Sequence, residues 1–181
     1  MTEASRKRFA EVVVPHIDSA YRLARGLAGN PADADDIVQD ACMRAFKGID
    51  GYAGGHDRAW VLTITRNAAF TFMARNRPKQ MVLPSDEDEQ ERLINSAPDP
   101  SQSPEENLIT RMSLEALDAA IKSLSPPYRE IIVLREYNDL SYMEISGVTG
   151  LPIGTVMSRL ARARCMLLRV FSHTELHRAS S

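Results

Sequence analysis

The 181-residue sequence predicts an all-α protein of two small helical domains joined by a flexible acidic linker, with a helix-turn-helix in the C-terminal domain. Three observations support this fold class. Apolar residues recur at three- and four-residue steps, and the chain shows no convincing strand alternation. Prolines and acidic residues gather in the middle of the chain. Near the C-terminal end, a capped helix, a glycine turn and a second helix follow one another.

The composition excludes several protein classes. The chain is 44% hydrophobic and 25% charged, which is ordinary for a globular protein and argues against global disorder. Cys42 and Cys165 lie far apart, so a disulfide framework is excluded. The longest aliphatic stretch, 131–134, is too short to cross a membrane, and the polar N-terminus lacks the apolar segment of a signal peptide. We therefore expect a cytoplasmic protein with no membrane insertion.

The middle of the chain has the composition of a linker. Half of the ten prolines lie between residues 78 and 104. Residues 82–107 contain eight acidic residues and one base, which gives a net charge of −7. Such a segment cannot bury enough apolar surface to fold. We place the linker at 78–103, between an N-terminal domain at 1–77 and a C-terminal domain at 104–181.

The formal net charge of −2 conceals two basic blocks. Five bases and no acid lie between residues 58 and 85, and four arginines and no acid lie between residues 145 and 174. Surface helices usually mix both signs of charge, so windows of this length indicate contact with a polyanion. Solvated helix faces are the alternative interpretation.

Helix signals cover the N-terminal domain. The apolar spacing from Phe9 to Leu27 predicts one amphipathic helix that ends near the following glycines. Asn30 and the proline after it predict the start of a second helix, which stops near residues 48–51. After a glycine-rich turn, Asp57 can cap a third helix over residues 58–76.

The C-terminal domain contains three further start signals. Ser103, followed by a proline and Glu106, predicts a capping box and a helix. Ser125 precedes a helix that runs through residues 126–137. Ser141 opens a short helix over 141–147 through a second capping box, Gly150 makes a turn, and residues 152–170 form the last long helix.

The last two helices have the spacing of a helix-turn-helix, and the second presents two different faces. Its core face consists of Val156, Leu160, Ala163 and Leu167. A polar and basic face, suited to phosphates and to base edges in a major groove, consists of Thr155, Ser158, Arg159 and Arg162. An ordinary surface helix of a three-helix bundle is the alternative interpretation.

Nearly the whole chain, apart from the linker and short tails, resembles the extracytoplasmic-function (ECF) sigma factors of bacterial RNA polymerase. The run LSPPYREIIVLREYNDLSYMEISGVTGLPIGTVMSRLARARCML resembles region four of that family. The run GNPADADDIVQDACMRAFKGIDGY resembles the polymerase-binding helix of region two, and AWVLTITRNAAFTFMARNR resembles the promoter-reading helix after it. The resemblance implies a subunit that binds core polymerase, holds duplex −35 DNA and melts the −10 element.

The resemblance also implies roles for particular residues of the N-terminal domain. Asp35, Asp36 and Gln39 match the helix that docks on the clamp helices of the largest polymerase subunit. Recognition of the −10 strand needs a basic track and rings for flipped bases. The matching residues are Tyr52, Arg58, Arg66, Asn67, Arg75 and Arg77. Tyr52 is the stacking candidate, whereas Trp60 and Phe72 are expected in the core.

In region four, Thr155, Ser158, Arg159 and Arg162 match the positions that face the −35 element. Two residues depart from the family pattern. Met157 stands where many members have lysine, and Gly147 lies inside a helix, where it marks either an early helix end or a close packing contact. For the acidic linker two interpretations stay open: a segment that threads a basic channel of the polymerase, and a simple tether.

Three classes of function compete at this stage. A sigma factor has no catalytic residues of its own, and its partners are core RNA polymerase, promoter DNA and an anti-sigma factor. A stand-alone helix-turn-helix regulator is the alternative, but it has no need of the Asp35, Asp36 and Gln39 helix. An enzyme is not expected. His173 and His177 have a metal-compatible spacing but lie in a polar tail, so no metal site or cofactor is expected.

Overall fold

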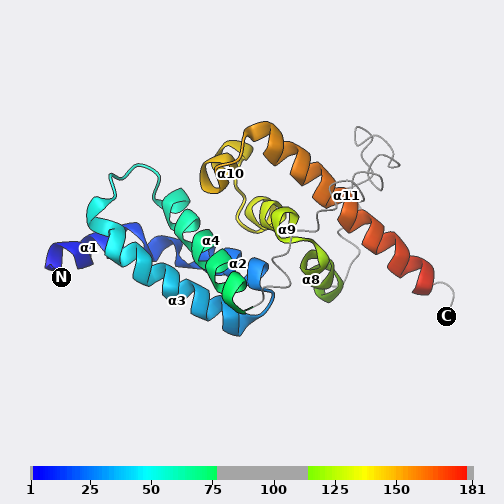
Figure 1. Cartoon of the computed structure of the whole chain (residues 1–181), viewed down its shortest axis with the longest axis horizontal. Coiled ribbons are helices and arrows are strands. Elements are labelled where there is room, and N and C mark those ends of the chain that lie inside the picture. Colours follow the sequence, from blue (N-terminus) through cyan, green and yellow to red (C-terminus); the bar gives the residue numbers. More distant parts are fainter. Residues whose placement is uncertain (1, 77–113, 179–181) are drawn as a thin grey trace.

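A computed structural model describes residues 2–76 and 114–178, with side chains in the second range described for residues 116–170. Within these ranges the chain is helical and contains no strand. The N-terminal domain (Figure 1) comprises α1 (Glu3–Val12), α2 (Ile17–Ala28), α3 (Pro31–Gly48) and α4 (Asp57–Asn76). The C-terminal domain comprises α8 (Leu114–Ser123), α9 (Pro126–Ile132), a π-helical turn (Val133–Tyr137), α10 (Tyr142–Thr149) and α11 (Ile153–Arg178).

The prediction of one helix from Phe9 to Leu27 is wrong. Two helices, α1 and α2, are separated by a short 3₁₀ turn at Val14–His16. Pro15 lies in this turn, and proline both lacks a backbone N–H and clashes with the preceding helical turn. The α-helical hydrogen bonding is therefore interrupted there. The apolar spacing continues across the break, which is why periodicity alone missed it.

The start of α3 is confirmed in atomic detail. The Asn30 side chain accepts a hydrogen bond from the backbone N–H of Asp33 at 2.9 Å, and a proline follows at the first helical position. The start of α4 differs by one residue from the prediction. Asp57 is the first residue of the helix and not its cap, because the backbone N–H of Trp60 donates to the His56 carbonyl.

The helix predicted over 126–137 forms, but its second half is π-helical. The α-helix α9 begins after the N-cap Ser125 and passes at Val133 into the π-helical turn, which ends at Tyr137. The next residues reverse the chain through Asp139, which has a left-handed backbone with φ of 51°. The Ser103 capping box predicted upstream, with Glu106, lies outside the described residues.

The helix-turn-helix signals are confirmed. Ser141 accepts from the backbone N–H of Glu144, whose side chain accepts from the backbone N–H of Ser141 in return, so both halves of the capping box are present. Gly150 ends α10 in the left-handed region with φ of 73°. Both interpretations of Gly147 are wrong: α10 continues past it to Thr149, and a Cβ at Gly147 would meet nothing within 4 Å.

One apolar core runs through both domains. Leu23, Leu27 and Leu62 of the N-terminal domain belong to the same buried cluster as Ile131 and Leu134 of the C-terminal domain. The helix α2 contacts α8, α9 and the π-helical turn, and α4 contacts α10. The two domains are therefore packed together. Among the described helices, none is long and apolar enough to cross a membrane.

Candidate nucleic-acid interface

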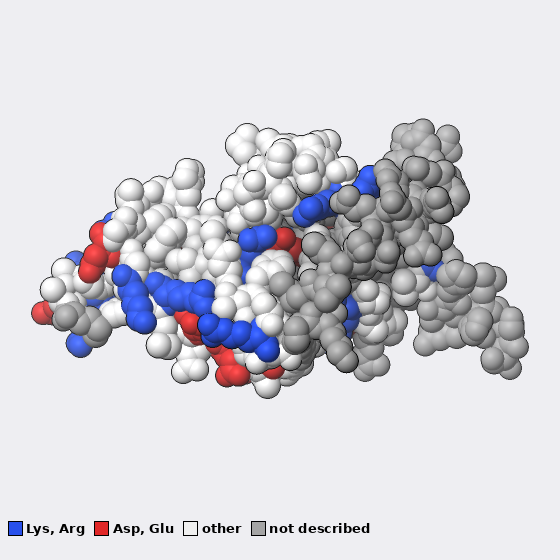
Figure 2. Space-filling model, viewed as in Figure 1, with Lys and Arg blue, Asp and Glu red and all other residues white. Residues whose placement is uncertain are grey.

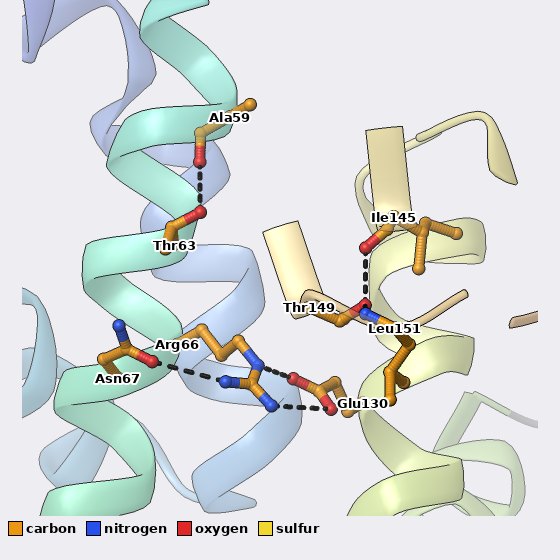
Figure 3. A network of polar contacts seen from close by, with 8 residues as sticks. All are labelled: Ala59, Thr63, Arg66, Asn67, Glu130, Ile145, Thr149 and Leu151. Atoms are coloured by element: carbon orange, nitrogen blue, oxygen red, sulfur yellow. Dashed lines mark hydrogen bonds and ion pairs between the residues drawn. The ribbon is translucent and has the colours of Figure 1, made fainter. Parts of the chain in front are cut away.

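The turn between α10 and α11 is fixed by side-chain hydrogen bonds. The Ser146 hydroxyl donates to the Leu151 carbonyl at 2.6 Å. The Thr149 hydroxyl donates to the Ile145 carbonyl at 2.7 Å and accepts from the backbone N–H of Leu151 at 3.3 Å, as Figure 3 shows. These bonds tie both backbone groups of Leu151, in the turn, to side chains at the end of α10.

The two faces predicted for α11 differ in burial. The core face is buried: Val156, Leu160, Ala163 and Leu167. On the polar face, Ser158 is exposed, whereas Thr155, Arg159 and Arg162 are partly buried. Met157 is 51% exposed beside this face, and Ile153 in the first turn is 43% exposed. The start of α11 therefore presents apolar as well as polar side chains to solvent.

The acidic face of α3 is open to solvent. Asp35, Asp36 and Gln39 are all exposed. Their acidic neighbours are held differently: Asp40 pairs with Arg44 at 2.7 Å, and Asp33 accepts from the Asn30 side chain at 2.8 Å. The predicted polymerase-binding residues are thus the members of this face that are most accessible.

The loop before α4 is organised by Tyr52. Its ring stacks on Trp60 with centroids 4.3 Å apart and 19° between the planes. Its hydroxyl donates to Asp57 at 2.8 Å and accepts from the backbone N–H of His56 at 3.0 Å. Burial, aided by the hydrogen bond to Asp57, raises the pKa of Tyr52 above its usual value. Both Trp60 and Phe72 pack against the core as expected.

The predicted −10 residues of α4 divide into two groups. Asn67 and Arg75 are exposed, while Arg77 lies outside the described residues. Arg58 and Arg66 contact the C-terminal domain. Arg58 donates to the carbonyl of Asn138, and Arg66 donates from Nε and Nη2 to the two carboxylate oxygens of Glu130 (Figure 3).

Glu130 is a buried charged residue that the sequence did not single out. Only 2% of its side chain is exposed, and it lies on α9 facing α4. Burial raises the pKa of Glu130, and the hydrogen bond and charge of Arg66 and the charge of Arg159 oppose that rise. In the sequence, Glu130 is an ordinary acid in a mixed segment. No local pattern marks it, because its partner lies in another domain.

Charged side chains are distributed unevenly over the surface. Figure 2 shows a row of lysine and arginine side chains across the N-terminal domain, with acidic side chains beside it. Basic and acidic side chains also meet at the junction of the two domains. Among the described residues, no group of three histidine, cysteine or acidic side chains is arranged to hold a metal ion.

Taken together, a helix-turn-helix domain and a helical domain with an acidic face and a basic helix define a DNA-binding transcription protein. Comparison with known families agrees with this class. Residues 12–78 match the model of Sigma-70 region 2, and residues 114–167 match the model of Sigma-70 region 4. Both matches fall on helices of the structure: the first on α2 to α4, the second on α8 to α11.

Individual relatives give the same result. The chain is 32% identical over 136 residues to the ECF RNA polymerase sigma-E factor of Escherichia coli, covering 73% of this chain and 70% of that protein. It is 35% identical over 166 residues to the ECF RNA polymerase sigma factor SigE of Mycolicibacterium smegmatis; this covers 91% of this chain but 62% of the longer relative. The chain belongs to the ECF sigma factor family of bacterial RNA polymerase.

A solved structure resembles the chain as a whole. The sigma factor RpoE of Bartonella quintana, in complex with the anti-sigma factor NepR, superposes with a TM-score of 0.67 at 26% sequence identity. The match covers 92% of this chain and 98% of that one. The likeness therefore extends over both domains.

Proposed function

We propose that this chain directs promoter-specific transcription initiation by binding core RNA polymerase, holding −35 DNA with its C-terminal domain and trapping the −10 strand with its N-terminal domain. One observation carries the proposal: both sigma regions occur in order in one chain. A stand-alone regulator would need the helix-turn-helix but would have no need of the region 2 helices. Bond formation belongs to the polymerase, so the chain itself is not an enzyme. We place its action in the cytoplasm, together with the polymerase.

Each region has a proposed task and a proposed set of residues. Residues 1–77 bind core polymerase and open the −10 element, residues 78–103 connect the domains, and residues 104–181 hold the −35 duplex. Polymerase docking is assigned to Asp35, Asp36 and Gln39, because exposed short acids and amides suit a basic coiled coil. The −35 contacts are assigned to Thr155, Ser158, Arg159 and Arg162.

The −10 contacts are assigned to Tyr52, Arg58, Arg66, Asn67, Arg75 and Arg77. Of these residues, Tyr52 has the least direct proposed contact with DNA, because its ring already stacks on Trp60. Its ring supports the loop through this stack. An anti-sigma factor is a further proposed partner, since the relative with the similar structure binds one.

Multi-round transcription with purified core polymerase on fragmented genomic DNA tests this function. Adding the full chain should produce discrete new transcripts whose start sites share upstream motifs. Gel shifts with and without core enzyme provide the control. Tight promoter binding by the free chain at physiological salt, unchanged by core polymerase, would support a stand-alone regulator instead and overturn the proposal.

A further inference from the structure

The helix α2 packs against the π-helical turn of the other domain. Gly26 faces Val133, and a Cβ built on Gly26 would lie 2.6 Å from both Cγ atoms of that valine. Real Cβ atoms do not come so close, and the β-branched side chain of valine has few rotamers to retreat into. The contact therefore needs glycine at this position, although glycine weakens the interior of a helix.

Polar contacts lock the same junction. Arg129 of α9 donates to the Leu27 carbonyl at the end of α2 at 3.0 Å. Arg58 of α4 donates to the Asn138 carbonyl, and Arg66 donates to both oxygens of Glu130. A paired arginine and carboxylate with this fork geometry makes the strongest kind of side-chain hydrogen bonding. Arg25 of α2 also pairs with Asp118 of α8 at 3.9 Å, so four arginines connect the domains.

Two of these arginines belong to the track assigned to the −10 strand. The guanidinium of Arg66 lies over the Phe70 ring, 4.8 Å from the ring centroid, and this contact helps to hold it in place. The carboxylate of Glu130 offers this guanidinium two acceptor oxygens, as a DNA phosphate would. While the two domains are packed together, Arg66 cannot donate the same N–H groups to a phosphate.

We propose that the C-terminal domain is an intramolecular competitor for single-stranded DNA on α4, with Glu130 taking the place of a backbone phosphate on Arg66. This inference rests on the proposed function, because it concerns the −10 surface. The chain closes on itself when free, and the domains must separate before α4 can bind a strand. The charge of Glu130 also acts on Arg159, but Arg159 lies in the same domain, so separation of the domains releases Arg66 and not Arg159.

Gly26→Ala separates the domains without touching any assigned DNA contact. The added methyl group collides with Val133, while within α2 alone alanine is the better helix former. The N-terminal domain therefore keeps its fold. Val133→Ala removes both Cγ atoms, so the double variant should close again. Gly147→Ala is the matched control, because it makes the same change in a helix where the methyl group meets nothing within 4 Å.

Two measurements on the full chain decide the matter. Small-angle scattering should give a larger radius of gyration for Gly26→Ala than for the wild type, the double variant and the control. Fluorescence anisotropy with a labelled single-stranded DNA of mixed sequence should show about tenfold tighter binding for Gly26→Ala alone. An unchanged radius of gyration would overturn the closing interface. Expansion without tighter DNA binding would overturn the competition.

The two proposals fail separately in these experiments. A wild-type chain that is compact but starts no transcription with core polymerase would refute the proposed function and leave the closing interface standing. A chain that starts transcription normally but shows no response to Gly26→Ala would refute the closing interface alone.

Discussion

Tyr52 stacks on Trp60 at 4.3 Å between ring centroids, and its hydroxyl joins the Asp57 carboxylate to the backbone N–H of His56. The loop before α4 is therefore held by one side chain that makes a ring contact and two hydrogen bonds. This arrangement positions the start of α4, from which the proposed −10 contacts project.

Tyr52→Phe should keep the ring stack and remove both hydrogen bonds. The Asp57 carboxylate and the His56 N–H then lose a partner, and we expect a loss of about 1–2 kcal/mol in the free energy of unfolding. Urea denaturation followed by circular dichroism measures this loss. Tyr128→Phe is the control, and an equal loss in both variants would contradict the role of the Tyr52 hydroxyl.

Arg159→Ala should weaken binding of holoenzyme to −35 duplex DNA by about 1–3 kcal/mol, because one donor to phosphates or base edges is removed. Binding to core polymerase should stay unchanged. Arg164→Ala provides the control, since Arg164 pairs with Glu136 at 2.9 Å within the same domain. Footprinting of the holoenzyme compares the two, and an unchanged promoter profile for Arg159→Ala would count against the assigned face.

Asp36→Lys should reduce the affinity for core polymerase about tenfold, because it reverses a charge on an exposed face that suits a basic partner. Glu11→Lys makes the same charge change on α1, where the residue forms an exposed pair with Lys7 at 4.0 Å. Pull-down with tagged core enzyme measures both. Normal association of Asp36→Lys with core polymerase would refute the assignment of α3 as the docking helix.

Met157→Lys should strengthen binding to −35 duplex DNA, since a cation replaces an exposed apolar side chain near the start of α11. One additional phosphate contact should steepen the slope of log affinity against log salt concentration by about 0.9. Val170→Lys, farther along the same helix, should leave the slope unchanged. Equal slopes for the two variants would show that position 157 faces away from DNA.

The stability of the closed chain should depend on pH through Glu130. Its pKa is raised by burial above the ordinary value of 4.5, so the folded chain binds more protons than the unfolded chain in the window just above that value. This contribution is fully present below pH 4.5 and is lost as the pH rises through the raised pKa. Denaturation at several pH values should show that the free energy of unfolding of the wild type falls relative to that of Glu130→Gln as the pH rises. A difference in free energy of unfolding that is constant with pH would contradict the raised pKa of Glu130.

Local signals in the sequence predicted the local structure well. The Asn30 cap, the Ser141 capping box and the Gly150 turn all depend on hydrogen bonds between residues close in the chain, and all are present. The break before α2 was missed although Pro15 marks it, because apolar spacing continued across the turn. The π-helical turn at 133–137 has no local signature.

The domain packing could not be predicted from one sequence. Arg66 and Glu130 are 64 positions apart, and each looks like a solvated surface residue in its own segment. Arg58 and Arg66 were predicted to bind DNA from their basic block and family match, and that assignment stays a prediction. Their contacts with the C-terminal domain depend on geometry that no local pattern records.

Two of the links between the domains end on main-chain oxygens. Arg58 donates to the carbonyl of Asn138, and Arg129 donates to the carbonyl of Leu27. A carbonyl is supplied by every amino acid, so the accepting positions can drift in sequence without losing these bonds. The constraint falls on the donors alone. These two links therefore leave little covariation between the domains, and comparison of related sequences would detect the side-chain pair of Arg66 and Glu130 more readily than either of them.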